Sequence, residues 1–504
     1  MGRHSKVPAP GEKNLGPAGP DAAAPSDRGP APRARLLAPA LAALREARWA
    51  LVVFLVVAVV QGVYYINNIG ALTMPDPLMH SLGSYALATG QALNPCVEVT
   101  DTEGNPRRVQ TLAGDSRYLL TKETRNDMIS AIIAGPFPTD PARDAQIAAC
   151  AEEGFGMELP PTEEVERDTG ITVFHGRSNQ YFPLAWLPQA LGIRVGISLG
   201  WQPYDVWQAG RVSSLVCYLA LYGAAVAIAP RMRWVLVALG LIPTTLFAAS
   251  SLMCDAFLVS LCTLSVALTL RLVSRGRRVR TGEALALGCV AALALLGKVV
   301  YAPACLGFLV LPHRQLGVRG KIVATAPVAL ALVAYLAWSA TIGDMAAIVN
   351  LRDNIAYAVA HLGTVAARIG YMVLNLPAIL LNGDGVYLGF ALVVAALLAW
   401  EALRARRGEK DGAPAGADPS DAALAPAAPT WRDWLSGHRY VVGAVVAGAA
   451  SVAGILLFLL LTWNDLAAGP DIAYVEGFQG RYLLPLWPLL LYASTVLPAP
   501  ATRR

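Results

Sequence analysis

Charged side chains are scarce in this sequence of 504 residues. Asp, Glu, Lys and Arg make up 15% of it, whereas a soluble domain usually carries about 25%. Hydrophobic residues make up 55%, and the mean hydropathy is +0.47. A helix of about 20 apolar residues crosses the hydrocarbon core of a bilayer, so stretches without charge over this length predict membrane spans. Because lipid offers no partner to an unpaired backbone amide, open sheets are excluded from these stretches.

The first apolar stretch, Trp49–Ile66, begins too late for a signal peptide and no cleavage site follows it, so we expect an uncleaved helix that carries the chain outwards. Within Glu283–Leu311, a single span would bury Lys298, so two short helices that meet near this lysine are expected. Seven further stretches predict spans: Val206–Ala229, Trp234–Ala249, Ala256–Val273, Ile322–Ala340, Val386–Trp400, Tyr440–Trp463 and Leu483–Leu497. The sequence therefore predicts an all-α polytopic membrane protein with about ten spans, nine or eleven being the alternatives.

Positive charge is depleted from one long segment and concentrated in others. Residues 67–205 contain 17 Asp or Glu and 9 Lys or Arg, which leaves a net charge of about −8. Residues 1–48 hold eight Lys or Arg, and the connection Arg271–Arg280 is also basic. The positive-inside rule then predicts a cytoplasmic N-terminus and one large extracytoplasmic loop at residues 67–205. Short arginine clusters beside spans are typical topology signals, so no nucleic-acid partner is expected.

The predicted organisation follows from these spans and charges. No internal repeat is apparent, which argues against a transporter built on repeated halves. The expected segments are a disordered cytoplasmic N-terminus (1–45), the first helix (46–66), the large loop (67–205), a multi-span core (206–400) with outward-side helices lying along the membrane (344–383), a cytoplasmic linker (401–438) and the last two membrane helices (439–504).

Cysteine pairs with the CxxC spacing of many metal sites are missing. Five of the seven cysteines lie in or at the ends of predicted spans, where small apolar core residues are the simplest interpretation. Cys96 and Cys150 are the only two in the predicted outer loop, an oxidising location that permits a disulfide. A Cys96–Cys150 disulfide and two free thiols both stay open.

Polar residues gather at the predicted outward ends of spans. Asp76 and His80 are four residues apart, so they share one face of the helix expected over Pro75–Gly90. A carboxylate there could accept the proton of an attacking hydroxyl or hold a divalent cation, and the alternative is an N-cap beside a surface histidine. The candidates for substrate binding are Gln180, Tyr181, Ser251, Asp255, Lys298, Tyr301, Gln479 and Arg481.

The basic members of this group suit a phosphate. The planar fork of Arg481 could form a bidentate contact with phosphate, and Lys298 would add a second positive charge. Each group taken alone could simply lie among lipid headgroups. Acidic, basic and phosphate-binding types together on one predicted side favour a site.

Several motifs, taken in order, resemble a family of bacterial membrane proteins known as domain-of-unknown-function family 2142. These proteins are similar to the C-type glycosyltransferase (GT-C) superfamily, whose members have multiple spans and an active site at the outer surface. The most specific motif is Gly477–Pro485. The others are Pro75–His80, Asn179–Pro183, Leu187–Gly192, Ser251–Ala256 and Lys298–Pro303.

The resemblance implies a glycosyltransferase of the bacterial cytoplasmic membrane. It would transfer a sugar from a polyprenyl-phosphate donor to a glycan or glycolipid acceptor of the cell envelope. Asp76 would be the general base, assisted by His80 or by a divalent cation (Mg or Mn) that Asp76 holds. Arg481 and Lys298 would stabilise the leaving phosphate.

The chain departs from the family pattern at two positions, which keeps other functions open. Pro77 stands where a second acid is usual, and Met253 stands where a second serine is expected. The missing acid puts a two-carboxylate metal site in doubt. A transporter or flippase of lipid-linked glycan and a non-catalytic partner in envelope glycan assembly are the alternative functions.

Overall fold

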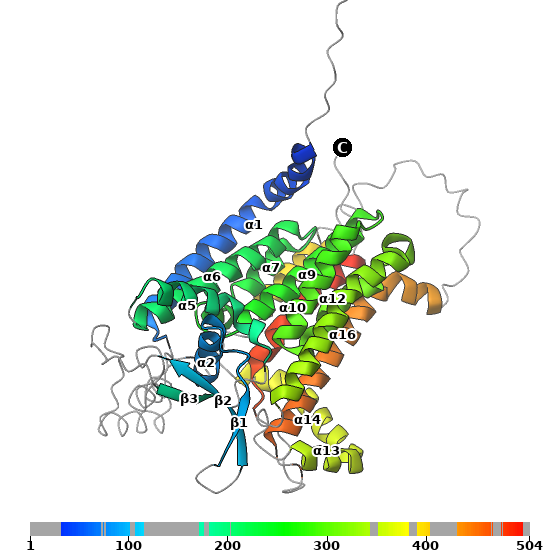
Figure 1. Cartoon of the computed structure of the whole chain (residues 1–504). Coiled ribbons are helices and arrows are strands. Elements are labelled where there is room, and N and C mark those ends of the chain that lie inside the picture. Colours follow the sequence, from blue (N-terminus) through cyan, green and yellow to red (C-terminus); the bar gives the residue numbers. More distant parts are fainter. Residues whose placement is uncertain are drawn as a thin grey trace, which may run out of the picture. The chain divides into compact units, whose positions relative to one another are not determined.

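The computed structural model is divided into two units, Met1–Arg45 and Glu46–Arg504, and the following description concerns the second unit, which Figure 1 draws with its helices and strands labelled. The structure describes residues 32–71, 74, 77–100, 106–114, 171–175, 181–201, 203–342, 351–382, 391–403, 431–464, 466, 475 and 477–496.

Helices make up most of the described chain, with α for α-helices and η for 3-10 helices. The first group consists of α1 (Pro32–Asn68), α2 (Pro77–Ala88), η2 (Pro183–Trp186), α5 (Leu187–Ser198), α6 (Pro203–Ile228), α7 (Arg233–Gly240), α8 (Pro243–Ala249) and α9 (Asp255–Arg275). The second group consists of α10 (Thr281–Gly297), η3 (Val299–Tyr301), α11 (Ala302–Cys305), η4 (Leu306–Val310), α12 (His313–Ile342), α13 (Leu351–Ala360), α14 (Leu362–Asn382), α16 (Trp431–Trp463) and η7 (Gly480–Val496).

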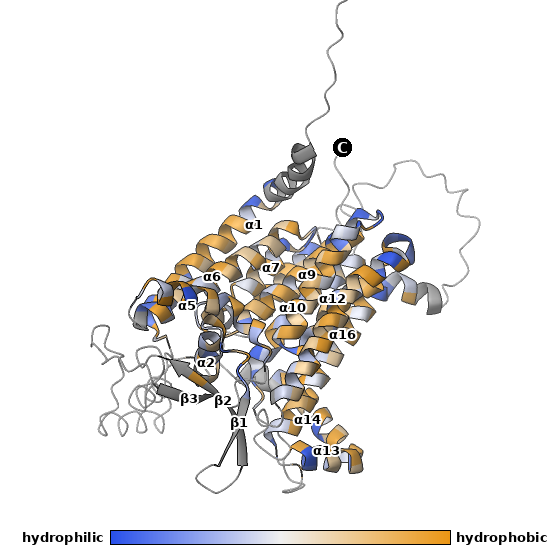
Figure 2. Ribbon diagram, viewed as in Figure 1, coloured by the Kyte–Doolittle hydropathy of each residue, from blue (hydrophilic) through white to orange (hydrophobic). Residues whose placement is uncertain are grey.

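Five helices of the described chain are long and apolar enough to cross a membrane, or six if the bent pair α13–α14 is one span. Figure 2 shows hydrophobic residues along most of α1, α6, α9 and α16. Five predicted stretches are confirmed as candidate spans, whereas the total of about ten is not confirmed. The candidate spans are Ala47–Asn68, Asp205–Ile228, Asp255–Arg275, His313–Thr341 and Leu435–Trp463.

Two of the other predicted stretches contain proline and do not form one α-helix. Trp234–Ala249 forms α7 and α8 instead of one helix, because Pro243 lacks an amide proton and holds the preceding residue in an extended conformation. Leu483–Leu497 falls mainly within η7, a 3-10 helix that contains Pro485 and Pro488. A 3-10 helix of this length is uncommon.

The predicted break at Lys298 is present. Lys298 ends α10 in an extended conformation, with φ −151° and ψ 113°, and short helical turns follow it from Val299 to Val310. Farther along, α13 and α14 meet at a bend of 99°. Asn354 of α13 donates hydrogen bonds to the carbonyls of Leu461 (2.9 Å) and Asn464 (2.6 Å), so α13 is attached to the end of α16.

One small sheet corrects the all-α prediction. Strands β1 (Cys96–Thr100), β2 (Pro106–Gly114) and β3 (Ile171–His175) pair antiparallel in the order β1-β2-β3. All three lie within the predicted outer loop, outside the apolar stretches from which sheets were excluded. Whether this loop faces outwards stays a prediction.

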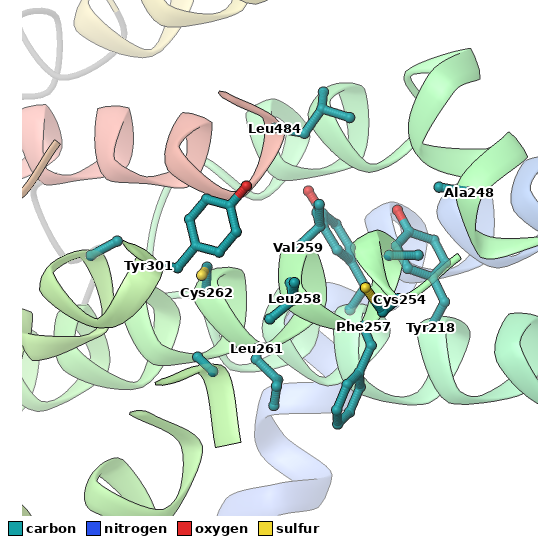
Figure 3. Close-up of a cluster of buried hydrophobic side chains, with 14 of the residues drawn as sticks. Tyr218, Ala248, Cys254, Phe257, Leu258, Val259, Leu261, Cys262, Tyr301 and Leu484 are labelled. Carbon is teal, nitrogen blue, oxygen red and sulfur yellow. The ribbon is translucent and has the colours of Figure 1, made fainter. Parts of the chain in front are cut away.

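Helix α9 is the most buried of the candidate spans. Within its apolar window 78% is buried, against at most 50% for the other four spans. Figure 3 shows its side chains, among them Leu258 and Cys262, packed in a cluster with Tyr218, Tyr301 and Leu484. Because α9 is surrounded by protein on most sides, the residue at its first turn, Asp255, has a fixed position.

A buried arginine connects the ends of three helices. Arg211 of α6, 1% exposed, donates to the carbonyls of Tyr65 (2.8 Å), Ile66 (3.1 Å) and Ile69 (2.8 Å) at the end of α1. Its Nε also donates to the carbonyl of Ser250, 2.7 Å away, at the end of α8. These carbonyls belong to helix ends, where carbonyls commonly lack a backbone partner, although that of Tyr65 also accepts the amide proton of Ile69 (3.1 Å).

Candidate functional site

Two basic residues and one acidic residue that are distant in the sequence meet at the start of α9. The Nζ atom of Lys298 lies 2.8 Å from Oδ1 of Asp255, and Nε of Arg481 lies 3.9 Å from Oδ2 of the same carboxylate. All three side chains are buried, with exposed fractions of 1% for Asp255, 8% for Lys298 and 7% for Arg481. Their formal charges add to +1, so this cluster can bind an anion.

Asp255 follows a turn that is stabilised by hydrogen bonds from the polar side chains of Ser251 and Gln189. Ser251 Oγ donates to the carbonyl of Ala248 (2.9 Å) and accepts the amide proton of Met253 (3.2 Å). Gln189 Nε2 donates to the carbonyl of Met253 over 2.8 Å. Since these bonds fix both ends of the turn, the carboxylate at the start of α9 is preorganised.

Aromatic rings surround Lys298. Its Nζ lies 4.9 Å from the ring centroid of Tyr181 and 5.0 Å from that of Tyr482, distances at which a cation is attracted to the ring. The hydroxyl of Tyr301 donates to the carbonyl of Tyr482 (2.9 Å), which attaches η3 to η7. Burial raises the pKa of Tyr181, so its hydroxyl is neutral at physiological pH.

His80 lies beside this cluster, on α2, and is 1% exposed. Trp186 Nε1 donates to His80 Nδ1 over 3.2 Å, so the neutral ring carries its proton on Nε2. Burial lowers the pKa of His80 to about 3; Asp255 opposes this change, while Arg481 and Lys298 reinforce it. The imidazole is therefore neutral at physiological pH, and it can donate a hydrogen bond from Nε2.

A cavity of about 60 Å³ adjoins Lys298. Its walls come from membrane helices and from the segments that carry the site, including Ile455 and Trp463 of α16 and Tyr335 of α12. Apart from Lys298 and the tyrosine hydroxyls, the lining is apolar. The cavity therefore joins a buried positive charge to an apolar surface between candidate membrane spans.

Gly477 positions the loop that leads to Arg481. It has a positive φ of 79°, and a Cβ atom there would lie 3.0 Å from the ring of Trp463. Only glycine combines this backbone conformation with so close an approach. The loop therefore packs against the indole that lines the cavity.

Several predicted site residues meet in the structure, and others lie outside the described residues. Lys298, Asp255, Arg481, Tyr181, Tyr301 and His80 are brought together. Asp76, Gln180 and Cys150 are not among the described residues, and nor is the side chain of Cys96, so the general base and the disulfide stay predictions.

Two of the candidates make contacts within the protein. The described hydrogen bonds of Ser251 remain inside its own turn. Gln479 is partly exposed and its carbonyl accepts the amide proton of Tyr482 (2.9 Å). Substrate binding by either side chain stays a prediction.

The described residues do not suit a divalent cation. Lys298 and Arg481 already balance the carboxylate of Asp255, and a metal ion would have to displace these two positive charges. Among the described residues, no three His, Cys, Asp or Glu side chains form a group that could hold a metal. The predicted Mg or Mn site thus depends on Asp76 and stays a prediction.

Sequence reasoning missed Trp186, Gln189 and Arg211. Arg211 carried a usable signal, since an ionisable residue inside an apolar helix faces the protein interior and has partners there. Trp186 had no such signal, because a tryptophan in an apolar run is usual at a membrane surface. Gln189 belongs to a recognised motif, but its partner Met253 is remote in sequence.

The fold and the site define a helical membrane protein with a buried ionic cluster between its helices. The chain belongs to the family described as predicted membrane protein DUF2142, whose model matches residues 152–406. No curated protein and no solved structure matches the chain. The matched segment includes Asp255 and Lys298, whereas His80 and Arg481 lie outside it.

Proposed function

We propose that this protein is a membrane glycosyltransferase of a bacterial envelope. It transfers a sugar from a polyprenyl-phosphate donor to a glycan or glycolipid acceptor on the outer face of the cytoplasmic membrane. The observation that supports this best is the pair of buried cations, Lys298 and Arg481, beside a cavity walled by membrane helices. A lipid phosphate presents an anionic head and an apolar chain, and it needs both kinds of surface next to each other.

The reaction is a single displacement that inverts the anomeric carbon. An acceptor hydroxyl oxygen forms a bond to that carbon, and the bond from the carbon to the phosphate oxygen breaks. The electron pair of the broken bond stays on the phosphate, where Lys298 and Arg481 stabilise the developing charge. Asp76 accepts the proton of the hydroxyl.

Two further residues prepare this site. Asp255 is a positioning residue, because its carboxylate holds both cations at fixed places before the donor binds. His80 is a hydrogen-bond donor in this scheme and not a base, since its Nδ1 is occupied by Trp186 and its ring is neutral. In this scheme His80 therefore assists catalysis only by donating a hydrogen bond from Nε2.

A transfer assay on the purified protein tests the proposal. With a radiolabelled polyprenyl-phosphate sugar and an envelope glycan acceptor, we expect Asp76→Asn and Arg481→Ala each to lower turnover by about 100-fold or more. Arg481→Lys should recover part of the loss, and Arg319→Ala, a change at an exposed arginine, should behave as wild type. Wild-type turnover in both Asp76→Asn and Arg481→Ala would refute the assigned roles.

The same preparation distinguishes the alternative functions. A flippase would move the labelled lipid across reconstituted vesicles without any product in the transfer assay. A non-catalytic partner would bind the lipid and give neither result.

A further inference from the structure

A second apolar cavity lies between two elements that also line the cavity at Lys298. It is a groove of about 430 Å³ between α16 and η7. Gly448 and Val452 form one wall, and Leu483, Leu486 and Leu490 belong to the other. All of its lining residues are described, and none of them is charged.

The groove continues the cavity at Lys298 along both walls. On α16, Gly448 and Val452 line the groove, whereas Ile455 and Leu459 line the cavity. These four positions recur at helical spacing, so they form one stripe on one face of α16. On η7, Tyr482 lines the cavity, and Leu483 directly after it lines the groove.

The length and exposure of this path suit a lipid chain. With a rise of about 1.5 Å per residue, α16 extends roughly 27 Å from Leu459 to Val441, which is close to the thickness of the hydrocarbon core. Val445 is 66% exposed and Leu490 is 45% exposed at the groove, so it opens to the surroundings of the helices.

The head of the path favours a single chain. The cavity next to Lys298 is narrow, at about 60 Å³, and one hydrocarbon chain needs less width there than two acyl chains on a glycerol backbone. A prenyl phosphate has one phosphate and one chain. Its phosphate can lie at Lys298 and Arg481 while its chain lies along the path.

We propose that the path from the cavity at Lys298 into the groove between α16 and η7 holds the isoprenoid chain of a polyprenyl phosphate. The chain leaves the phosphate at Lys298 and Arg481, passes Ile455 and Tyr482, and lies against Gly448 and Val452. This inference rests on the proposed function for the identity of the lipid and assigns its tail a binding site.

Photo-crosslinking on the full-length protein in lipid nanodiscs tests this site. The probe is a polyprenyl phosphate that carries a diazirine on a tail unit remote from the phosphate, and mass spectrometry locates the labelled peptides. We expect labels on α16 between Val441 and Val452 and on η7 between Leu486 and Ala493. An excess of unlabelled polyprenyl phosphate should suppress them.

A pair of glycine variants on the same helix provides the matched control. In Gly448→Leu the new side chain enters the groove, because a Cβ atom there meets only Leu489 at 3.5 Å. We expect its labelling to fall about tenfold, which corresponds to the loss of one or two buried methylene groups. Gly437→Leu adds the same side chain where nothing lies within 4 Å and should keep wild-type labelling. Equal thermal midpoints for both variants show that the fold is intact.

The outcomes separate this inference from the proposed function. Labels elsewhere on the protein, or equal labelling by a diacyl phosphatidic acid with the same diazirine, would overturn the isoprenoid site. Labelling of the groove in a protein without transfer activity would support the site and count against the transferase. Transfer activity without labelling of the groove would support the transferase and count against the site.

Discussion

At the scale of single residues, the carboxylate of Asp255 determines whether Lys298 and Arg481 can both stay charged below the surface. An unpaired charge in a protein interior costs several kcal/mol, and each cation here has the same carboxylate as its partner. Asp255 therefore has a role in stability that can be separated from any catalytic role of the site.

Replacing Asp255 by Asn should destabilise the protein strongly. The change removes the carboxylate that pairs with two buried cations, Lys298 and Arg481, which should lower the free energy of unfolding by about 3–5 kcal/mol. Thermal and denaturant unfolding in detergent measure this loss. Adding Lys298→Met to Asp255→Asn removes the orphaned charge and should recover part of it.

Glu283 provides the matched control for this prediction. Its carboxylate also pairs with cations, Arg275 at 3.0 Å and Arg277, but these side chains are partly exposed, by 26% for Glu283, 31% for Arg275 and 37% for Arg277. Surface pairs contribute about 1 kcal/mol or less, so Glu283→Gln should have a small effect. Equal stabilities of Asp255→Asn and Glu283→Gln would show that Asp255 is not a buried counter-ion.

The low pKa of His80 in the folded protein predicts that the stability of the protein depends on pH. Its pKa is about 3 in the folded protein and 6.5 in the unfolded chain, so between these values only the unfolded chain binds the proton. Stability should therefore rise with pH across this window. From pH 5 to pH 7 this one group contributes about 2 kcal/mol.

The variant His80→Gln isolates that contribution. Glutamine keeps an acceptor for Trp186 Nε1 and does not titrate, so the difference in unfolding free energy between pH 5 and pH 7 should be smaller than in wild type. The comparison uses the same two pH values for both proteins. An identical pH dependence in the two would mean that His80 is not buried as a neutral ring.

The residues of the site were predictable in part. Lys298 and Arg481 stood out because a cation at the edge of an apolar stretch is costly unless it has a function or a partner. Their shared partner Asp255 was named as a candidate, but its role between them depends on a contact across 43 residues to Lys298 and 226 to Arg481. No local pattern in a sequence encodes such a contact.

At the scale of elements, hydropathy found the longest helices of the structure, including the part of α12 that follows its kink at Gly317. It failed where the backbone changes conformation inside an apolar stretch, as at Pro243 and in η7. Hydropathy measures whether a segment prefers lipid, and it is blind to a missing amide proton. The small sheet was missed because its strands, unlike the spans, carry no long apolar run.

Arg211 should be essential for the junction of α1, α6 and α8. Its guanidinium satisfies carbonyls of Tyr65, Ile66, Ile69 and Ser250, and hydrogen bonds from a charged donor contribute about 1.5–3 kcal/mol each. We expect Arg211→Met to abolish stable folding or to lower the thermal midpoint sharply, as measured by fluorescence-detected size exclusion after heating.

Two comparisons keep this prediction sharp. Arg211→Lys retains the charge but cannot reach four carbonyls with one ammonium group, so it should be intermediate. Arg271→Met, at a half-buried arginine that donates to the carbonyl of Ile228 (3.1 Å), should be milder. If Arg271→Met destabilises the protein as much as Arg211→Met, the prediction that the Arg211 junction is essential for stability is wrong.

At the scale of the whole molecule, the charge pattern and the position of the site together predict the orientation of α9 in the membrane. Four arginines cluster at the opposite end of α9 from Asp255: Arg275 ends the helix, and Arg277, Arg278 and Arg280 follow it. If the positive-inside rule puts this arginine cluster in the cytoplasm, the end of α9 that carries Asp255 lies on the outer side. The predicted outer loop and the candidate site would then share one side of the membrane.

Reporter fusions test this orientation directly. Alkaline phosphatase folds only outside the cytoplasm and green fluorescent protein folds efficiently inside it, so each fusion reports the side of its insertion point. We expect phosphatase activity for an insertion near Asp115 in the loop and fluorescence for fusions at Gly276, in the arginine cluster. Neutralising Arg275, Arg277, Arg278 and Arg280 together should weaken the fluorescence at Gly276, because it removes the signal that holds this connection inside. Phosphatase activity at Gly276 together with none at Asp115 would invert the topology and place Asp255, Lys298 and Arg481 on the cytoplasmic side, where an extracytoplasmic acceptor could not reach them.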